Sequence, residues 1–268
     1  MINSKAVTSI TEKPLVIKIG GAILEKPEAL ASLLEVIKTL TNKKIVLVHG
    51  GGCVVDEMLS QAGLQSEKLN GLRVTPKAHM PLISGALAGT VNKTIVANAN
   101  KIGLSAIGLS LADGAIVQCQ LNSHNLGCVG VPQANSSKLL DTLLNSQFLP
   151  VVSSIGALTN GELVNVNADD AAVVICQLLN AELLLLTDVN GVKGSDGEYL
   201  TSIDQSLADQ LISQGVIAGG MTAKINAAIY AANQLRRSIA VASWKAPEQI
   251  KNLLAGDSIG TRVQPSIY

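Results

Sequence analysis

The chain has 268 residues, enough for one large α/β unit or for two lobes in close contact. Hydrophobic residues make up 47% of it and aromatic residues only 2%, so the core must be built from Ala, Val, Ile and Leu, as in parallel sheets with helices on both faces. Basic and acidic residues number 20 each, so the net charge is zero and gives no electrostatic reason to expect binding to nucleic acid or to an anionic membrane.

The remaining composition argues against zinc sites and secretion. The four cysteines are scattered without a Cys-x-x-Cys pair, and the three histidines lie far apart, so we expect no metal site. Residues 1–13 are polar, lack the apolar run of a signal peptide, and are interpreted as a flexible leader. No apolar run reaches the ~20 residues that span a bilayer. We therefore expect a cytoplasmic protein with no membrane partner.

Two strand–glycine turn–helix units open the chain. The apolar run at 15–21 contains Lys18 and ends in two glycines, and apolar spacing then predicts a helix from about residue 27. Residues 45–52 repeat the pattern, with Ile-Val-Leu-Val before His-Gly-Gly-Gly, and another helix comes next. Two successive units of this kind predict parallel strands with right-handed crossovers.

Lys18 is unusual because it lies inside an apolar strand. A buried ammonium group needs a partner, since removing it from water unpaired is costly. Glycines allow backbone N–H groups to approach an anion closely. One interpretation is therefore a phosphate or carboxylate site at the carboxyl end of the strand. The other is a strand-end lysine that reaches solvent before an ordinary turn, and this stretch alone leaves both open.

The middle of the chain predicts a helical stretch at 76–101, broken or kinked near Pro81. The other elements that we expect up to residue 167 are a strand at 105–111, a hairpin at 115–120 and 126–131 on the sheet edge or rim, a helix at 137–146, and strands at 149–153 and 163–167. No linker of low complexity separates this part of the chain from its second half.

The second half begins near Ala168. The expected elements are a helix at 171–179, a strand at 183–186, helices at about 206–214 and 220–236, and strands at 239–242 and 261–263. Asp169 and Asp170 precede the first of these helices, where acidic residues suit the helix dipole, and we expect Asp170 to serve only the dipole and solvent. The pattern predicts an α/β protein, a three-layer αβα sandwich with an open, mostly parallel central sheet shared by two lobes.

Ligands of open α/β sheets bind outside the carboxyl ends of the strands. Those ends carry Lys18 with its glycines, residues 49–52, Asn165 with Asn167, and Asp188. The chain has no G-x-x-x-x-G-K-[ST], no G-x-G-x-x-G opening a helix and no G-x-S-x-G. We expect Lys93, within a near match to the first motif, to be structural or solvated. For His49 we expect a structural hydrogen bond rather than a catalytic base.

Six blocks of sequence resemble the N-acetylglutamate kinases of the amino-acid-kinase family. They lie at 18–21, 48–52, 70–75, 165–169, 186–192 and 219–224, and the similarity extends from about residue 14 to 263 in the family's order. The Asn-Gly-Leu-Arg-Val-Thr block at 70–75 points to the acetylglutamate branch rather than to aspartate, uridylate, carbamate or glutamate 5-kinases. The resemblance implies the amino-acid-kinase fold over 14–268. It further implies an N-lobe, 14–167, that binds acetylglutamate and dimerises, and a C-lobe, 168–268, that binds ATP.

The resemblance also implies an activity. The family transfers the γ-phosphoryl group of ATP to the side-chain carboxylate of N-acetyl-L-glutamate, the second step of arginine synthesis by the acetylated route. A carboxylate is ionised near neutral pH, so no general base is required. Lysines and backbone N–H groups would stabilise charge during in-line transfer. Magnesium would be held mainly by the phosphate oxygens of ATP, with no dedicated protein site.

Site residues follow from the resemblance block by block. Lys18 and Lys224 would bracket the phosphoryl group, and Asp169 would hold both. The residues expected to bind acetylglutamate are Gly51, Gly52, Arg73 and Asn165. The residues expected to bind phosphate and nucleotide are Gly20, Gly21, Asp188, Val189, Asn190, Gly191, Val192, Lys193, Val216, Ile217 and Ala218.

Two alternatives remain at this point: a kinase for N-acetylaminoadipate or a related acylated amino acid, and a non-catalytic amino-acid sensor with the same fold. One methylene group changes affinity by only about 1–3 kcal/mol, which sequence patterns do not reveal. Arginine-inhibited members of the family carry a longer N-terminal helix that links dimers into hexamers. The leader is short and polar by comparison, so we expect an arginine-insensitive homodimer.

Overall fold

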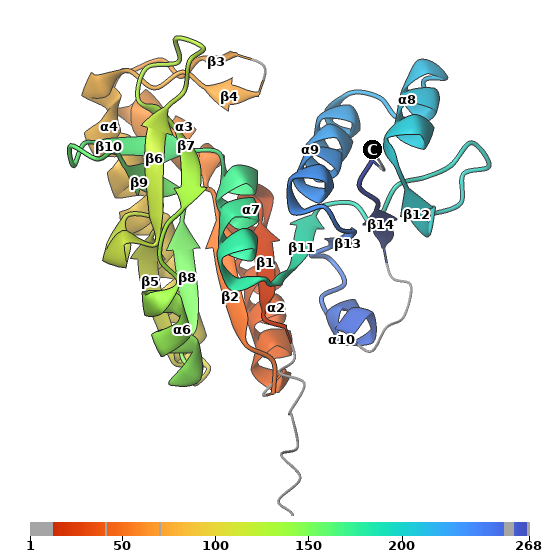
Figure 1. Ribbon diagram of the computed structural model, residues 1–268, viewed down its shortest axis with the longest axis horizontal. Coiled ribbons are helices and arrows are strands. Elements are labelled where there is room, and N and C mark those ends of the chain that lie inside the picture. Colours follow the sequence, from red (N-terminus) through yellow and green to blue (C-terminus); the bar gives the residue numbers. More distant parts are fainter. Residues whose placement is uncertain (1–12, 41, 70, 255–259, 267–268) are drawn as a thin grey trace, which may run out of the picture.

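A computed structural model describes residues 13–40, 42–69, 71–254 and 260–266. The predicted leader lies outside these residues except for Lys13. An eight-stranded sheet with the order β12-β14-β13-β11-β1-β2-β8-β5 runs through the whole molecule. In Figure 1 the strands of the first half of the chain lie on the left and those of the second half on the right. The expectation of one sheet shared by both halves is confirmed.

The strands of this sheet follow the predicted runs closely, except for the two-residue β12, which was not predicted. They are β1 (Leu15–Ile19), β2 (Ile45–His49), β5 (Ala106–Ser110), β8 (Leu149–Ser153), β11 (Glu182–Thr187), β12 (Ser202–Ile203), β13 (Ile239–Ser243) and β14 (Thr261–Val263). All neighbouring pairs are parallel except β13 and β14, so the sheet is mostly parallel, as predicted.

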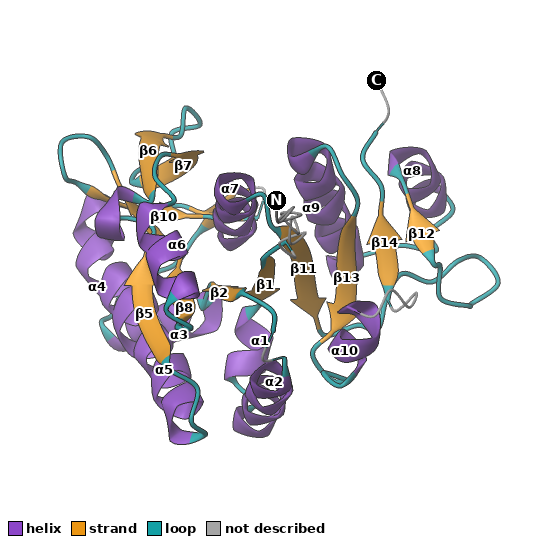
Figure 2. Cartoon of the chain, turned by 60° about the horizontal axis from the view of Figure 1, so that its bottom comes forward, coloured by secondary structure: helices purple, strands orange, loops and turns teal. Residues whose placement is uncertain are grey.

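Helices cover both faces, which gives the predicted three layers (Figure 2). One face carries α1 (Gly21–Leu24), α2 (Pro27–Thr39), α5 (Asn92–Lys101) and α10 (Gln249–Leu254); the other carries α6 (Lys138–Asn145), α7 (Ala168–Leu179), α8 (Gln205–Ser213) and α9 (Gly220–Leu235). Successive strand residues point to opposite faces. Ile17 therefore packs in the layer of α2, whereas Val16 packs in the layer of α7. Lys18, two residues after Val16, points to the same face as Val16.

A second, four-stranded sheet lies beside the first half of the main sheet. It consists of β6 (Val117–Leu121), β7 (Val129–Ala134), β10 (Leu163–Val166) and β9 (Ile155–Ala157), in that spatial order. The predicted hairpin is β6–β7, but its placement on the edge of the main sheet was wrong. Within the hairpin, β7 pairs in parallel with β10, the strand that comes just before α7 in the chain. The hairpin therefore belongs to the small sheet.

The small sheet is accompanied by α3 (Gly52–Gln61), α4 (Met80–Ser84) and a short hairpin of β3 (Lys68–Leu69) and β4 (Leu72–Arg73). Apolar side chains of α3, of α4 and of residues 86 and 87, which follow α4, form a third core cluster with Ile155. Among the residues that the structure describes, no helix combines the length and apolarity needed to cross a bilayer.

The long helical stretch differs from its prediction in the position of the irregularity. Pro81 lies in the first turn of α4, after the short helix η1 (Lys77–His79), where its missing N–H has no intrahelical partner to lose. The irregular part is instead the π-helical segment η2 (Gly85–Val91), which leads directly into α5. Its apolar spacing resembles that of an ordinary helix, so the sequence does not distinguish the two.

Candidate active site

Two glycine turns meet at the carboxyl ends of the central strands. Gly20 and Gly21 follow β1, and residues 50–52 follow β2, which pairs with β1 in parallel. A Cβ atom on Gly21 would lie 3.2 Å from Cys53 Sγ and 3.7 Å from the backbone nitrogen of Gly52. The two turns are therefore packed against each other. They lie at the carboxyl ends of central strands of the sheet, which is where α/β proteins bind ligands.

Lys18 has the partner that its burial requires. Its Nζ lies 2.8 Å from Asp169 Oδ1, and the two side chains are 17% and 26% exposed. Asp169 is in the first turn of α7, on the face of the sheet to which Lys18 points. The interpretation of Lys18 as a lysine that reaches solvent is therefore wrong, and its expected pairing with Asp169 is confirmed.

The start of α7 is set by Asn167. Its side-chain oxygen accepts hydrogen bonds from the backbone N–H groups of Asp169, at 2.7 Å, and Asp170, at 3.3 Å. Asp170 is partly buried, and this burial, together with the negative charge of Asp169, raises the pKa of Asp170 to about 6. The position of Asp170 in the first turn of α7 agrees with the expected dipole role, and its partial burial shows that it is less solvated than expected.

Lys224 does not share Asp169 with Lys18. It forms an ion pair with Asp188, which follows the carboxyl end of β11, and the side chains are 39% and 43% exposed. The hydrogen bond from Lys224 holds the pKa of Asp188 below its usual value. The prediction that Asp169 holds both ammonium groups was wrong for this structure, because each lysine finds its carboxylate in a different segment. Asp188 also lies within the electrostatic influence of Lys245.

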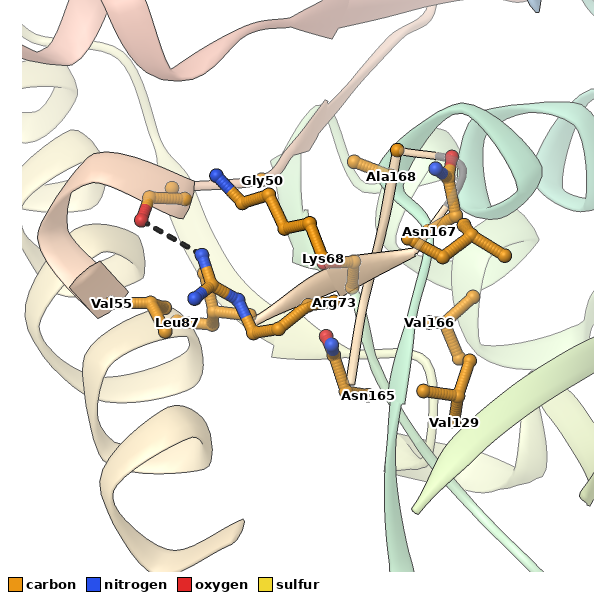
Figure 3. A pocket seen from close by; sticks show the side chains of 15 residues that line it. Gly50, Val55, Lys68, Arg73, Leu87, Val129, Asn165, Val166, Asn167 and Ala168 are labelled. Carbon is orange, nitrogen blue, oxygen red and sulfur yellow. Dashed lines mark hydrogen bonds between the residues drawn. The ribbon is translucent and has the colours of Figure 1, made fainter. Parts of the chain in front are cut away.

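A cavity of about 250 Å³ opens beside the glycine turns (Figure 3). It brings together four residues predicted to bind acetylglutamate, namely Gly51, Gly52, Arg73 and Asn165. The remaining lining residues are Gly50, Val55, Lys68, Gly71, Leu72, Leu87, Val129, Ser154, Val166, Asn167 and Ala168. Residue 70, at the start of the predicted block, lies outside the described residues.

Arg73 is held in place by several partners. Its guanidinium group donates to Asp56, to Ser66 and, at 3.0 Å, to the backbone oxygen of Gly52, and only 8% of the side chain is exposed (Figure 3). Partial burial acts to raise the pKa of Asp56, but hydrogen bonds from Arg73, Ser66 and Lys68 outweigh it and lower that pKa to about 2. Asp56 and Lys68 were missed in the sequence because neither belongs to a pattern that distinguishes it from a surface charge.

The predicted nucleotide residues fall into two groups by burial. Val192 and Ile217 are buried in the core, and the backbone N–H of Val192 donates to Thr261 Oγ1 at 2.8 Å. Val216 is exposed, and Lys193 Nζ lies 5.4 Å from the ring centre of Tyr199. The core positions can therefore act on a ligand only by shaping the loops around them. In the described part of the chain, no three His, Cys, Asp or Glu side chains are placed to hold a metal ion.

His49 and Lys93 have the structural contacts that were expected. His49 is fully buried, and its Nδ1 lies 2.7 Å from the backbone oxygen of Gly50. Lys93 Nζ donates to Asn92 Oδ1 at 3.1 Å and to the backbone oxygen of Gly108 at 3.3 Å. Neither side chain lines the cavity.

Comparison with known proteins gives a consistent result. The profile of the Amino acid kinase family matches residues 13–243. The acetylglutamate kinase of Colwellia psychrerythraea strain 34H is 70% identical over 254 residues, which cover 95% of this chain and 98% of the relative. That of Vibrio vulnificus strain YJ016 is 48% identical over 263 residues, 97% of this chain and 100% of the relative.

Among solved structures, the protein smu.665 of Streptococcus mutans UA159 superposes with a TM-score of 0.76 at 28% identity. The match covers 94% of this chain and 98% of that one. The fold, the family profile and the full-length relatives agree, and the chain belongs to the amino acid kinase family and, within it, to the acetylglutamate kinases.

Proposed function

We propose that the glycine turns, the Arg73 cavity and the two lysines together carry out the reaction of an acetylglutamate kinase. As a member of that group, the protein transfers a phosphoryl group from ATP to the side-chain carboxylate of N-acetyl-L-glutamate, a step of arginine biosynthesis. The chemical task is to hold two anions in line while negative charge spreads over the oxygens of the transferred group.

Lys18 and Lys224 are the proposed charge-stabilising residues. Asp169 keeps the Lys18 ammonium group at the glycine turns, 2.8 Å from its carboxylate. Lys224 is paired with Asp188 and half exposed, and the proposal requires it to turn from Asp188 to the phosphate oxygens when the nucleotide binds. The N–H groups of Gly20 and Gly21 would add donors on the phosphate side, as glycine turns do in other anion sites.

Arg73 and Asn165 are the proposed anchors of acetylglutamate. The Arg73 fork is already oriented by Asp56 and Gly52, and a planar guanidinium group suits the α-carboxylate of an amino acid. Asn165 Nδ2 lies 3.2 Å from Thr75 Oγ1, which orients the amide beside the cavity. Gly51 and Gly52 line the same cavity, and their backbone N–H groups are the proposed donors to the acceptor carboxylate.

The nucleotide would bind on the second half of the sheet, along 188–193 and 216–218. Magnesium would be carried mainly by the phosphates of ATP, where it would neutralise part of their charge, because the carboxylates beside the two lysines, Asp169 and Asp188, are each engaged in an ion pair. We further propose a homodimer. Sedimentation or light scattering of the purified protein checks this point, and a monomeric or hexameric mass would contradict it.

The observation that carries the proposal is the segment 165–169. It places Asn165 in the cavity wall and, four residues later, Asp169 on Lys18, so substrate pocket and phosphoryl site are built from one continuous stretch. The test is ATP turnover with N-acetylglutamate, with hydroxylamine present to trap the acyl phosphate as a hydroxamate.

N-acetylaminoadipate serves as the control substrate in the same assay. A pocket shaped for acetylglutamate should disfavour the longer acid by about 10-fold or more, because one methylene group is worth about 1–3 kcal/mol. Equal kcat/KM values would contradict the proposed specificity. Absence of any hydroxamate with either acid would contradict the phosphoryl transfer itself and favour a sensor.

A further inference from the structure

His49 is a buried residue with both ring nitrogens in use. Its Nδ1 lies 2.7 Å from the backbone oxygen of Gly50, which can only accept, so Nδ1 carries the proton. Its Nε2 lies 3.0 Å from Asn92 Nδ2, which can only donate, so Nε2 is the acceptor. The two contacts define a single neutral tautomer. Burial lowers the pKa of His49 to about 4, and the nearby positive charge of Lys93 acts in the same direction.

Asn92 connects this histidine to two further strands. It is fully buried at the start of α5, and its Nδ2 also lies 2.8 Å from Val151 O in β8 and 3.3 Å from Leu109 O in β5. A Cβ atom on Gly108 would lie 2.0 Å from Asn92 Oδ1, so the glycine there leaves the space that this side chain occupies. Asn92 is thus held by backbone oxygens of β5 and β8.

The π-helical segment η2 contacts the same glycine loop from another side. A Cβ atom on Gly51 would lie 2.9 Å from Val91 Cγ2 and 3.0 Å from Leu87 Cδ2. Leu87 also lines the cavity. Segments of π-helix are rare in proteins, and those that occur often lie at functional sites. Here η2 ends at the residue before Asn92. The side chains that pack against Gly51 and the amide that contacts His49 therefore come from one short stretch of chain.

We propose that His49 and Asn92 are positioning residues for phosphoryl transfer: the neutral imidazole, oriented by Asn92, donates to the Gly50 carbonyl and thereby fixes the backbone of Gly51 and Gly52 in the cavity. This inference rests on the proposed function, in which those two glycines accommodate the acceptor carboxylate. Neither side chain touches the substrate. Their effect passes through one backbone hydrogen bond, and small displacements of a reacting group can cost about 10²-fold in rate.

Two substitutions of His49 separate this role from a purely structural one. In His49→Asn, the amide nitrogen can take the place of Nδ1 and donate to Gly50, while the link to Asn92 is lost. In His49→Gln, the amide can take the place of Nε2 and reach Asn92, while the donor to Gly50 is lost. Both variants bury one neutral amide, so they carry similar folding costs.

Steady-state kinetics with acetylglutamate, at a temperature below the melting point of every variant, provides the test. We expect kcat/KM to fall about 10- to 100-fold in His49→Gln and less than about 5-fold in His49→Asn. Asn92→Leu should lie between them. Asn100→Leu is the matched control on the same helix, since Asn100 Oδ1 accepts from Ala106 N far from the cavity. It should lower the melting temperature and leave kcat/KM unchanged.

Equal kcat/KM values for the two His49 variants, or a better value for His49→Gln, would overturn the inference. A loss in Asn92→Leu no larger than in Asn100→Leu would do the same. If His49→Gln fails to fold, the comparison of His49→Asn with Asn92→Leu still decides, because only the latter retains the imidazole without its orienting amide. The wild-type assay tests the proposed function separately, since it does not depend on these variants.

Discussion

The proposed acetylglutamate cavity and the proposed nucleotide side of this kinase are built in different ways. In the cavity, the decisive cation, Arg73, is 8% exposed and held by Asp56, Ser66 and the Gly52 carbonyl. On the proposed nucleotide side, Lys224 is 39% exposed and its ammonium group is paired with Asp188. The first half is thus organised before any ligand arrives, whereas the second holds its lysine in an exchangeable surface pair.

This difference has an energetic meaning. A preorganised cation loses little side-chain entropy on binding, so the cavity can discriminate among small amino-acid derivatives. An exposed ion pair contributes about 0–1 kcal/mol, so Lys224 can leave Asp188 at little cost when a polyphosphate offers more charge. Lys18 lies between the two halves and is paired with Asp169 at 2.8 Å. Substitutions on the two sides should therefore have different effects.

Replacement of Lys18 should have the largest effect. We expect Lys18→Ala to lower kcat about 10²- to 10³-fold, because it removes a positively charged hydrogen-bond donor that stabilises the transferred phosphoryl group. Lys44→Ala is the matched control: its Nζ donates to Asn145 Oδ1 at 2.7 Å, away from the cavity. Turnover of acetylglutamate measures both, and a kcat for Lys18→Ala within threefold of the wild type would contradict the mechanism.

Arg73→Lys should act on substrate affinity rather than on turnover. A lysine cannot reproduce the planar fork, so we expect the KM for acetylglutamate to rise about 10-fold or more, with a smaller change in kcat. The same substitution at Arg237, which binds Asn180 Oδ1 at 2.9 Å, should affect stability and leave that KM unchanged. An unchanged KM in Arg73→Lys would show that the cavity is not the acetylglutamate site.

Asp170 should make stability depend on pH in an unusual direction. Its folded pKa of about 6 is above the ordinary value of about 3.9, so the folded state binds the proton more tightly and stability falls as pH rises from about 4 to about 6. Asp170→Asn should therefore raise the free energy of unfolding at pH 7 by an amount on the order of 2 kcal/mol and have little effect at pH 3. Urea unfolding at both pH values measures this, and a gain that is equal at pH 3 and pH 7 would contradict it.

The smallest expected effects are on stability, where the two carboxylates that pair with Arg73 and Lys224 can be compared directly. Asp56→Ala leaves Arg73 buried with fewer partners, and we expect a loss of about 1–3 kcal/mol, whereas Asp188→Ala should cost no more than about 1 kcal/mol. The pKa of Asp56, about 2, is below its ordinary value. Its contribution is therefore complete above about pH 4 and is lost as pH falls towards 2. Thermal unfolding at pH 7 and pH 3 measures both variants, and equal losses at pH 7 would remove the contrast.

The sequence predicted the central architecture because its signals are local. The runs at 15–19 and 45–49 alternate with glycine turns and amphipathic helices, so the parallel strands and the layers follow from periodicity. The partner of Lys18 could also be anticipated, because a lysine inside a strand requires a carboxylate and the resemblance supplied Asp169. The strands and layers needed no knowledge of how distant segments meet, whereas the pairing of Lys18 with Asp169 came from the resemblance.

The rest depended on tertiary contacts. Asp188 was expected near the nucleotide, yet its pairing with Lys224 depends on how the β11 loop meets α9. Asp56 orients Arg73 across 17 residues of chain, and no periodic pattern distinguishes it. Short strands such as β9 and β12 have too few residues for a pattern, and they owe their pairing to neighbours already in place. The π-helical segment was hidden by its ordinary apolar spacing.

The segment from Asn165 to Asp169 has a consequence for the length of the chain itself. Asn165 lies in β10, Asp169 lies in the first turn of α7, and only residues 166–168 separate them. A residue inserted or deleted between them would therefore displace Asn165 from the cavity wall, or Asp169 from Lys18, or the Asn167 cap from the start of α7. The number of residues in this stretch is thus as much a part of the proposed active site as their identity.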